Sequence, residues 1–206
     1  MKKTISLLLS ILLVSFVIQG PTTSAAFSDV GDRYKTEVDY IVANNYAQGI
    51  SPTQFGTQES IKRIDAAVMV ARAMGFDENS KSPSAGFTDV PTNRLWAVNA
   101  LASKGVISGK SPGKYGSDDT MTRSEMAKVI ASAYGLKASS DSIPFTDVSP
   151  RFISSVAALV ENEITQGKSS TKFGGSDNIK RGEFAIFIYK ADGLSKIEPP
   201  EVVDVS

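Results

Sequence analysis

The 206-residue chain contains neither cysteine nor histidine. Without cysteine, disulfides and thiolate zinc sites are excluded. Without histidine, imidazole metal ligands, Ser-His-Asp and Cys-His arrangements and the commonest general base are also missing. We therefore predict no metal site and no cofactor. We also expect no catalytic residues and no enzyme activity, although chemistry based on carboxylates alone stays open.

The chain also lacks an excess of either charge, because it holds 22 basic and 22 acidic residues. A general binder of nucleic acid or of a membrane surface shows a basic excess. We therefore expect neither of these as a partner.

One long apolar run, residues 5–18, stands near the start of the chain. Two lysines precede it, and Ser24-Ala25-Ala26 offers small residues for cleavage, which is the layout of a secretory signal peptide. The alternative is a membrane anchor, but a membrane-spanning helix needs roughly 20 apolar residues. We expect residues 1–26 to be a signal peptide cleaved near Ala25 or Ala26, which leaves a secreted protein without membrane contact.

What the chain does contain is an internal repeat of nearly 60 residues. The motif Phe-x-Asp-Val begins at Phe27, Phe87 and Phe145. At matching distances after each phenylalanine stand a glycine, an aromatic-glycine pair, an arginine, an acidic residue and a further glycine. Such self-similarity without insertions predicts three structural units. The predicted boundaries are 27–86, 87–144 and 145–196, with a tail at 197–206.

Each unit is predicted to form a helix, a loop rich in Gly, Ser, Pro and Thr, and a second helix. The first helix is expected over residues 34–45, 95–104 and 152–163, where apolar residues recur three or four positions apart. The second helix is expected to end at a glycine, which suits the left-handed conformation of a helix end. These glycines are Gly75, Gly135 and Gly193.

The start of the second helix is best defined in the middle unit, where Thr122 and Glu125 have the spacing of a capping box. Lysine replaces this threonine in the other two units, so Ser60 and Asn178 are expected to cap there instead. Two amphipathic helices cannot close a core alone, whereas three units around a common axis can. The sequence therefore predicts an all-α fold of three helix-loop-helix repeats with pseudo-threefold symmetry.

Taken together, these motifs resemble the S-layer homology family, over nearly all of residues 27–194. The most specific element is the family motif Ile-Thr-Arg-Ala-Glu at the start of the second helix. It stands here as Ile61-Lys62-Arg63-Ile64-Asp65, Met121-Thr122-Arg123-Ser124-Glu125 and Ile179-Lys180-Arg181-Gly182-Glu183. The chain departs from the family in two ways. Lys62 and Lys180 replace the threonine of this motif, and Trp96 is shifted from the place of the Trp-Ala pair that often opens the first helix.

The resemblance implies a three-pronged spindle that anchors the protein non-covalently to the bacterial cell wall. Its partner would be a secondary cell-wall polysaccharide linked to peptidoglycan, often ending in a ketal-pyruvylated amino sugar and bound in grooves between units. S-layer or other surface proteins are possible further partners. The alternative is a structural protein that assembles into an S-layer-type lattice.

By the same resemblance, the repeated arginine binds the carboxylate of the ligand, to which its planar fork is suited. The alternative is an ion pair with an acidic residue of the repeats. These arginines are Arg63, Arg123 and Arg181.

The remaining candidates each have a structural and a binding interpretation. The aspartate of Phe-x-Asp-Val caps the turn before the first helix or accepts from sugar hydroxyls. The loop glycine supplies a positive φ or lets the backbone approach a sugar ring. Ser111 is a candidate donor, and Trp96 is either a stacking platform or half-buried core. The aspartates and glycines are Asp29, Asp89, Asp147, Gly49, Gly109 and Gly167.

Overall fold

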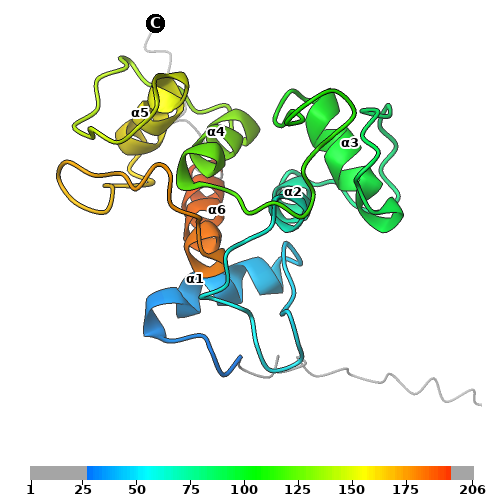
Figure 1. The fold of residues 1–206 in the computed structure, drawn as a ribbon. Coiled ribbons are helices and arrows are strands. Elements are labelled where there is room, and N and C mark those ends of the chain that lie inside the picture. Colours follow the sequence, from blue (N-terminus) through cyan, green and yellow to red (C-terminus); the bar gives the residue numbers. More distant parts are fainter. Residues whose placement is uncertain (1–26, 196–206) are drawn as a thin grey trace, which may run out of the picture.

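A computed structural model of the chain describes residues 27–195, which form six α-helices and two short 3-10 helices (Figure 1). The elements are α1 (Asp32–Ala43), α2 (Arg63–Ala73), η1 (Thr92–Arg94), α3 (Leu95–Ser103), α4 (Arg123–Ala133), η2 (Pro150–Phe152), α5 (Ile153–Glu161) and α6 (Arg181–Ser195). The part of the chain that is described has isolated β-bridges but no strand, so the all-α prediction is confirmed. The expected signal peptide and tail lie outside the described residues.

Two of the three predicted helix-ending glycines are confirmed. Gly75 and Gly135 follow the ends of α2 and α4 with φ of 82° and 63°. The prediction for Gly193 is wrong, because α6 continues through it to Ser195. The last helix packs against α1, and such tertiary contact can outweigh the low helix propensity of one glycine.

The capping box of α4 is confirmed. The Thr122 hydroxyl accepts from the Glu125 N–H at 3.2 Å, and the Glu125 carboxylate accepts from the Thr122 N–H at 2.9 Å. The substitute caps are wrong. Ser60 accepts from the Lys180 ammonium at 3.4 Å, and Asn178 accepts from the Thr120 hydroxyl at 3.0 Å. Both side chains contact the extended segment of another unit, so they are not available to their own helix.

A closed ring of three backbone hydrogen bonds joins the units at their centre. The Ile61 N–H donates to the Ile179 carbonyl (3.1 Å), the Ile179 N–H to Met121 (2.9 Å), and the Met121 N–H to Ile61 (3.1 Å). These three residues occupy the same position in their units. The third unit therefore bonds back to the first, as a pseudo-threefold axis requires.

The helices pack in the same cyclic order. The helix α3 packs against α2, α5 against α4, and α1 against α6, so the first helix of each unit lies on the second helix of the preceding unit. Figure 1 shows α2, α4 and α6 in the middle and α1, α3 and α5 on three outer sides. This closed order supports the three-pronged spindle, which stays a prediction.

The core follows from the repeated apolar positions. Val70, Ile130 and Ile188, on the second helices, are fully buried. The aromatic residue of each aromatic-glycine pair is also fully buried and lies beside the phenylalanine that opens its unit, with ring centroids 5.6 to 5.8 Å apart. Each loop is thereby fastened to the start of its own unit. Within residues 27–195 no helix combines the length and apolar character needed to cross a membrane.

Candidate functional site

Two clefts of similar size open between units. The basic cleft, of about 570 Å³, lies between the second and third units, and the tryptophan cleft, of about 550 Å³, between the first and second. The basic cleft is lined chiefly by Arg63, residues 105–110, Tyr115, Glu125, Lys128, Arg151 and Phe152. The tryptophan cleft is lined chiefly by Arg181, residues 46–50, Asp65, Val68, Met69, Arg72, Glu78, Asn93, Arg94 and Trp96.

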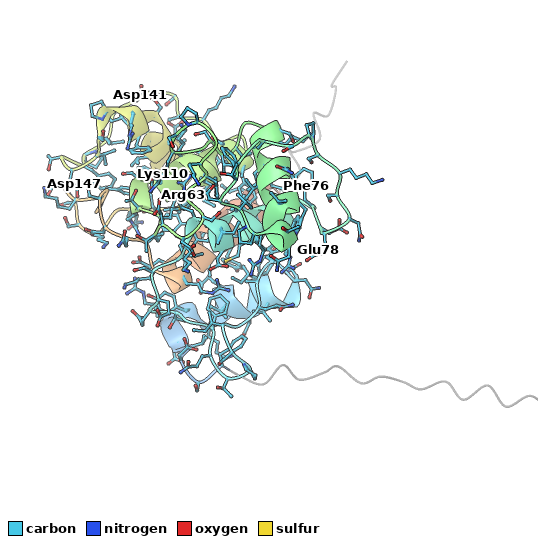
Figure 2. All side chains as sticks on the ribbon, turned by 45° about the vertical axis from the view of Figure 1, so that its right-hand side comes forward. Arg63, Phe76, Glu78, Lys110, Asp141 and Asp147 are labelled. Carbon is cyan, nitrogen blue, oxygen red and sulfur yellow. The ribbon has the colours of Figure 1, made fainter. Side chains whose placement is uncertain are left out.

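Both clefts have the same construction. The loop and second helix of one unit form one wall, and the start of the next unit's first helix forms the other. The third component is the repeated arginine of the preceding unit, so Arg63 enters the basic cleft and Arg181 the tryptophan cleft. Figure 2 shows Arg63 close to Lys110, which comes from the second unit. All three units must therefore be folded together for either cleft to exist.

Arg63 holds the loop of the second unit in place. Its Nε donates to the Tyr115 carbonyl and its Nη2 to the Ser108 carbonyl, both at 3.1 Å. The guanidinium lies 4.7 Å from the centre of the Tyr115 ring, a cation–π contact, and 3.8 Å from the Glu125 carboxylate. Only 7% of Arg63 is exposed. An ion pair of the kind considered above therefore exists, but it joins two units.

Arg181 makes the equivalent contacts in the tryptophan cleft. Its Nε donates to the Phe55 carbonyl at 3.0 Å and its Nη2 to the Gln48 carbonyl at 2.8 Å, while the guanidinium lies 4.8 Å from the Phe55 ring centre. Burial lowers the pKa of the Arg181 guanidinium, and the nearby Asp65 charge opposes that shift. Arginine side chains are charged at pH 7 in proteins.

Arg123 is placed differently. It lies between the rings of Phe173 and Phe187, 5.0 and 4.9 Å from their centres, and 3.8 Å from the Glu183 carboxylate. Its Nη2 lies 3.4 Å from the Thr165 hydroxyl, and its buried Nε has no hydrogen-bond partner among residues 27–195. In the other units the position of Phe187 is held by the smaller Met69 and Val129. The Phe187 ring thus lies against Arg123, whereas Met69 and Val129 line the two clefts.

The aspartate of Phe-x-Asp-Val fastens the aromatic-glycine turn of its own unit. Asp89 accepts from the N–H groups of Tyr115 and Gly116 at 2.8 Å and of Ser117 at 3.4 Å. Asp29 accepts from the three equivalent N–H groups of its unit and Asp147 from the first two. Desolvation raises the pKa of the Asp89 carboxyl, but these backbone donors lower it by more. The aspartate thus caps the aromatic-glycine turn and not the turn before the first helix. Its binding to sugar hydroxyls stays a prediction.

The loop glycine is required by the phenylalanine ring that lies on it. A Cβ on Gly109 would lie 2.5 Å from Phe87 and 2.6 Å from the Lys114 carbonyl, and Gly49 and Gly167 are equally close to their phenylalanines. Only Gly167 has a positive φ, of 78°, so that expectation is wrong for the other two. Gly49 and Gly109 do line the two clefts.

Ser111 and Trp96 have different positions. Ser111 is exposed and lies in a turn in which its own carbonyl accepts from the Lys114 N–H at 3.0 Å. It is not among the residues that line the basic cleft. Trp96 is half-buried, lines the tryptophan cleft, and has the Arg72 guanidinium 5.9 Å from its ring centre.

Two lining residues of the basic cleft, Lys128 and Arg151, were not found by sequence reasoning. The position of Lys128 is held by Val68 and Ile186 in the other units. A charge present in one unit alone carries no repeat signal. The signal for Lys128 is instead the difference in charge between the units at this position.

Comparison with known proteins matches two segments of the chain, residues 86–127 and 144–185, to the S-layer homology domain. These segments begin within a residue of the predicted starts of the second and third units. Similarity to this family is therefore found over most of the second and third units, while membership of the whole chain in the family stays a prediction. S-layer homology domains are cell-wall anchoring modules and not catalytic ones.

Several surface proteins are similar to the chain. A surface-layer 125 kDa protein of Lysinibacillus sphaericus is 26% identical over 200 residues, which is 89% of this chain and 17% of that protein. A cell surface protein of Thermoanaerobacter kivui is 28% identical, over 66% of this chain and 19% of that protein. A cellulosome-anchoring protein of Acetivibrio thermocellus is 31% identical, over 41% of this chain and 20% of that protein. The chain thus spans at most about a fifth of these relatives.

Proposed function

We propose that the chain is built of three S-layer homology units and anchors itself non-covalently to the bacterial cell wall. Its ligand would be a secondary cell-wall polysaccharide carrying a pyruvylated sugar, bound in the clefts between units. In this account the protein is secreted, stays at the cell surface and catalyses no reaction. Two matched units and relatives named as surface-layer, cell surface and cellulosome-anchoring proteins support this role.

The first segment, residues 27–86, has the contacts of a third unit. Asp29 accepts from the N–H groups of its own aromatic-glycine turn, as Asp89 does in the matched second unit. The Arg63 N–H donates to the Asp119 carbonyl at 2.9 Å, which corresponds to the 2.9 Å bond from Arg123 to Asp177. These equivalences favour three units of one kind.

The observation that carries the proposal is the guanidinium at the base of each described cleft. Arg63 and Arg181 are ordered by two backbone carbonyls and an aromatic ring, so little side-chain entropy remains to be lost when a ligand binds. A fixed cation in a concave, partly desolvated site favours a carboxylate. A pyruvyl ketal supplies such a carboxylate on a sugar that fits a cleft of this size.

Sedimentation with purified cell walls tests the proposal. The full chain is mixed with walls that keep their secondary polymer, with the same walls after acid extraction of that polymer, and with walls whose polymer lacks pyruvyl groups. We expect the protein to sediment only with the first preparation. Equal retention on extracted walls would contradict the proposal, and ordered sheets formed by the protein alone would favour self-assembly instead.

A further inference from the structure

The two clefts have the same architecture but differ in charge. At three corresponding positions the basic cleft carries a cation where the tryptophan cleft carries an uncharged side chain. The corresponding pairs are Lys110 and Ile50, Lys128 and Val68, and Arg151 and Asn93. The first pair directly follows the loop glycine, the second lies on the second helix, and the third stands before the first helix of the next unit. The difference therefore runs along both walls.

Two of the three arginines that line the tryptophan cleft are paired with carboxylates of the same cleft. The Arg94 guanidinium lies 3.2 Å from the Asp65 carboxylate, and the Arg72 guanidinium 2.6 Å from Glu78. All four residues line this cleft. The uncharged surface between them includes Ile50, which is 54% exposed and has the place of a lysine. An anion entering here would meet two carboxylates as well as the arginines.

The basic cleft holds two cations that form no ion pair among the described residues. Lys128 and Arg151 are exposed and form no ion pair within residues 27–195. Lys110 pairs at 2.7 Å with Asp119, which lies outside the lining of the cleft, and Glu125 is the one carboxylate among the lining residues. Charges of one sign in a concave site raise the local concentration of the opposite ion.

We infer that the basic cleft is the site that binds the acidic group of the glycan, and that the tryptophan cleft does not select for an acidic group. This inference rests on the proposed function and assigns the charged part of the ligand to one of the two clefts. Lys110, Lys128 and Arg151 determine the specificity, and the buried Arg63 forms the base of the site.

The chain offers a matched pair of variants for the test. Lys168 has the position of Lys110 in the third unit and the same ion pair, at 2.7 Å to Asp177. Arg33 has the position of Arg151 in the first unit. The Arg33 guanidinium lies 5.2 Å from the centre of the Tyr34 ring, and the Arg151 guanidinium lies 4.6 Å from that of Phe152. The doubles Lys110→Ala with Arg151→Ala and Lys168→Ala with Arg33→Ala therefore remove the same charges and the same local contacts.

Calorimetric titration with the methyl glycoside of a ketal-pyruvylated amino sugar measures the affinity of the full chain and of each variant for this probe. We expect the first double variant to bind at least about tenfold more weakly than the unchanged protein, because hydrogen bonds to charged groups are lost. The second double should change the affinity less than about twofold. Lys128→Ala should also weaken binding, and the methyl ester of the probe should bind all four proteins weakly.

The outcomes separate the inference from the proposed function. Equal losses in the two doubles, or equal affinity for the acid and its ester, would overturn the inference while wall retention stands. Retention on walls without binding of the probe would also overturn it. If the unchanged protein binds neither walls nor probe, the proposed function fails and the inference with it. Circular dichroism of each variant checks that the helices are kept.

Discussion

At the scale of single residues, the aspartate of Phe-x-Asp-Val gives stability that depends on its charge. The Asp89 carboxylate accepts three backbone N–H groups, and these donors lower its pKa from the ordinary value of 3.8 despite the opposing effect of desolvation. A folded pKa below the unfolded one means that the ionised group stabilises the fold above about pH 4. That contribution is lost as the pH falls through the folded pKa.

We predict that Asp89→Asn lowers the free energy of unfolding by about 1–2 kcal/mol at pH 7, because a charge-assisted acceptor is lost. The difference from the unchanged protein should shrink at pH 3, where the aspartate itself becomes protonated. Urea denaturation at both pH values measures this. The exposed Asp141, changed to Asn, serves as the control and should have little effect. A difference that is the same at both pH values would contradict the assigned role.

The repeated arginine could be found from the sequence, but its contacts could not. Three arginines at one position indicate a shared role, and the structure places two of them in clefts. Their main partners are backbone carbonyls of a different unit, such as Ser108 and Tyr115 for Arg63. A carbonyl has no signal in the sequence, and spacing within one unit says nothing about a neighbour.

At the scale of elements, the second helices begin in two ways. The helix α4 has a complete capping box, whereas Lys62 precedes α2 without any side-chain cap. The start of α2 is satisfied from the second unit instead, because the Arg63 N–H donates to Asp119 and the Ile64 N–H to Ser117. The equivalent inter-unit bonds also exist for α4, which therefore carries both kinds of contact.

We predict that Thr122→Ala costs about 1 kcal/mol of stability, since the N-cap acceptor is removed. The matched change Lys62→Ala, at the same position of the first unit, should cost clearly less, because its exposed ion pair with Asp118 contributes little. Thermal and urea unfolding of the two variants provide the comparison. Equal losses would show that the capping box does not stabilise α4.

Helix positions were predictable to within about two residues, because apolar periodicity marks the buried face. The expected range 34–45 corresponds to α1, Asp32–Ala43, and 95–104 to α3, Leu95–Ser103. The helix end expected at Gly193 was wrong, because α6, which packs on α1, continues to Ser195. Propensity of a single residue does not include such contacts.

At the scale of the whole molecule, the units are linked into a closed ring. The three central hydrogen bonds and the packing of α1 on α6 leave no unit with a complete core of its own. Pseudo-threefold packing was predictable from the repeat, because two amphipathic helices need partners. The pairing of the helices was not predictable. The first helix, α1, packs against the last, α6, and the pattern of apolar residues, being the same in every unit, does not indicate which units meet.

We predict that this ring unfolds in one cooperative transition. The single tryptophan, Trp96, reports on the second unit, while far-ultraviolet circular dichroism reports on all helices. In urea the two signals should have the same midpoint. A fluorescence change that precedes the loss of helix would mean that the second unit opens alone, and the units would then be independent.

The most direct measurement is a crystal structure of the chain with the ketal-pyruvylated amino sugar bound. The account predicts electron density in the basic cleft, with the ligand carboxylate within about 3 Å of the Lys128 ammonium or of the Arg63 or Arg151 guanidinium. Density on an outer face of the ring, away from both clefts, would contradict it.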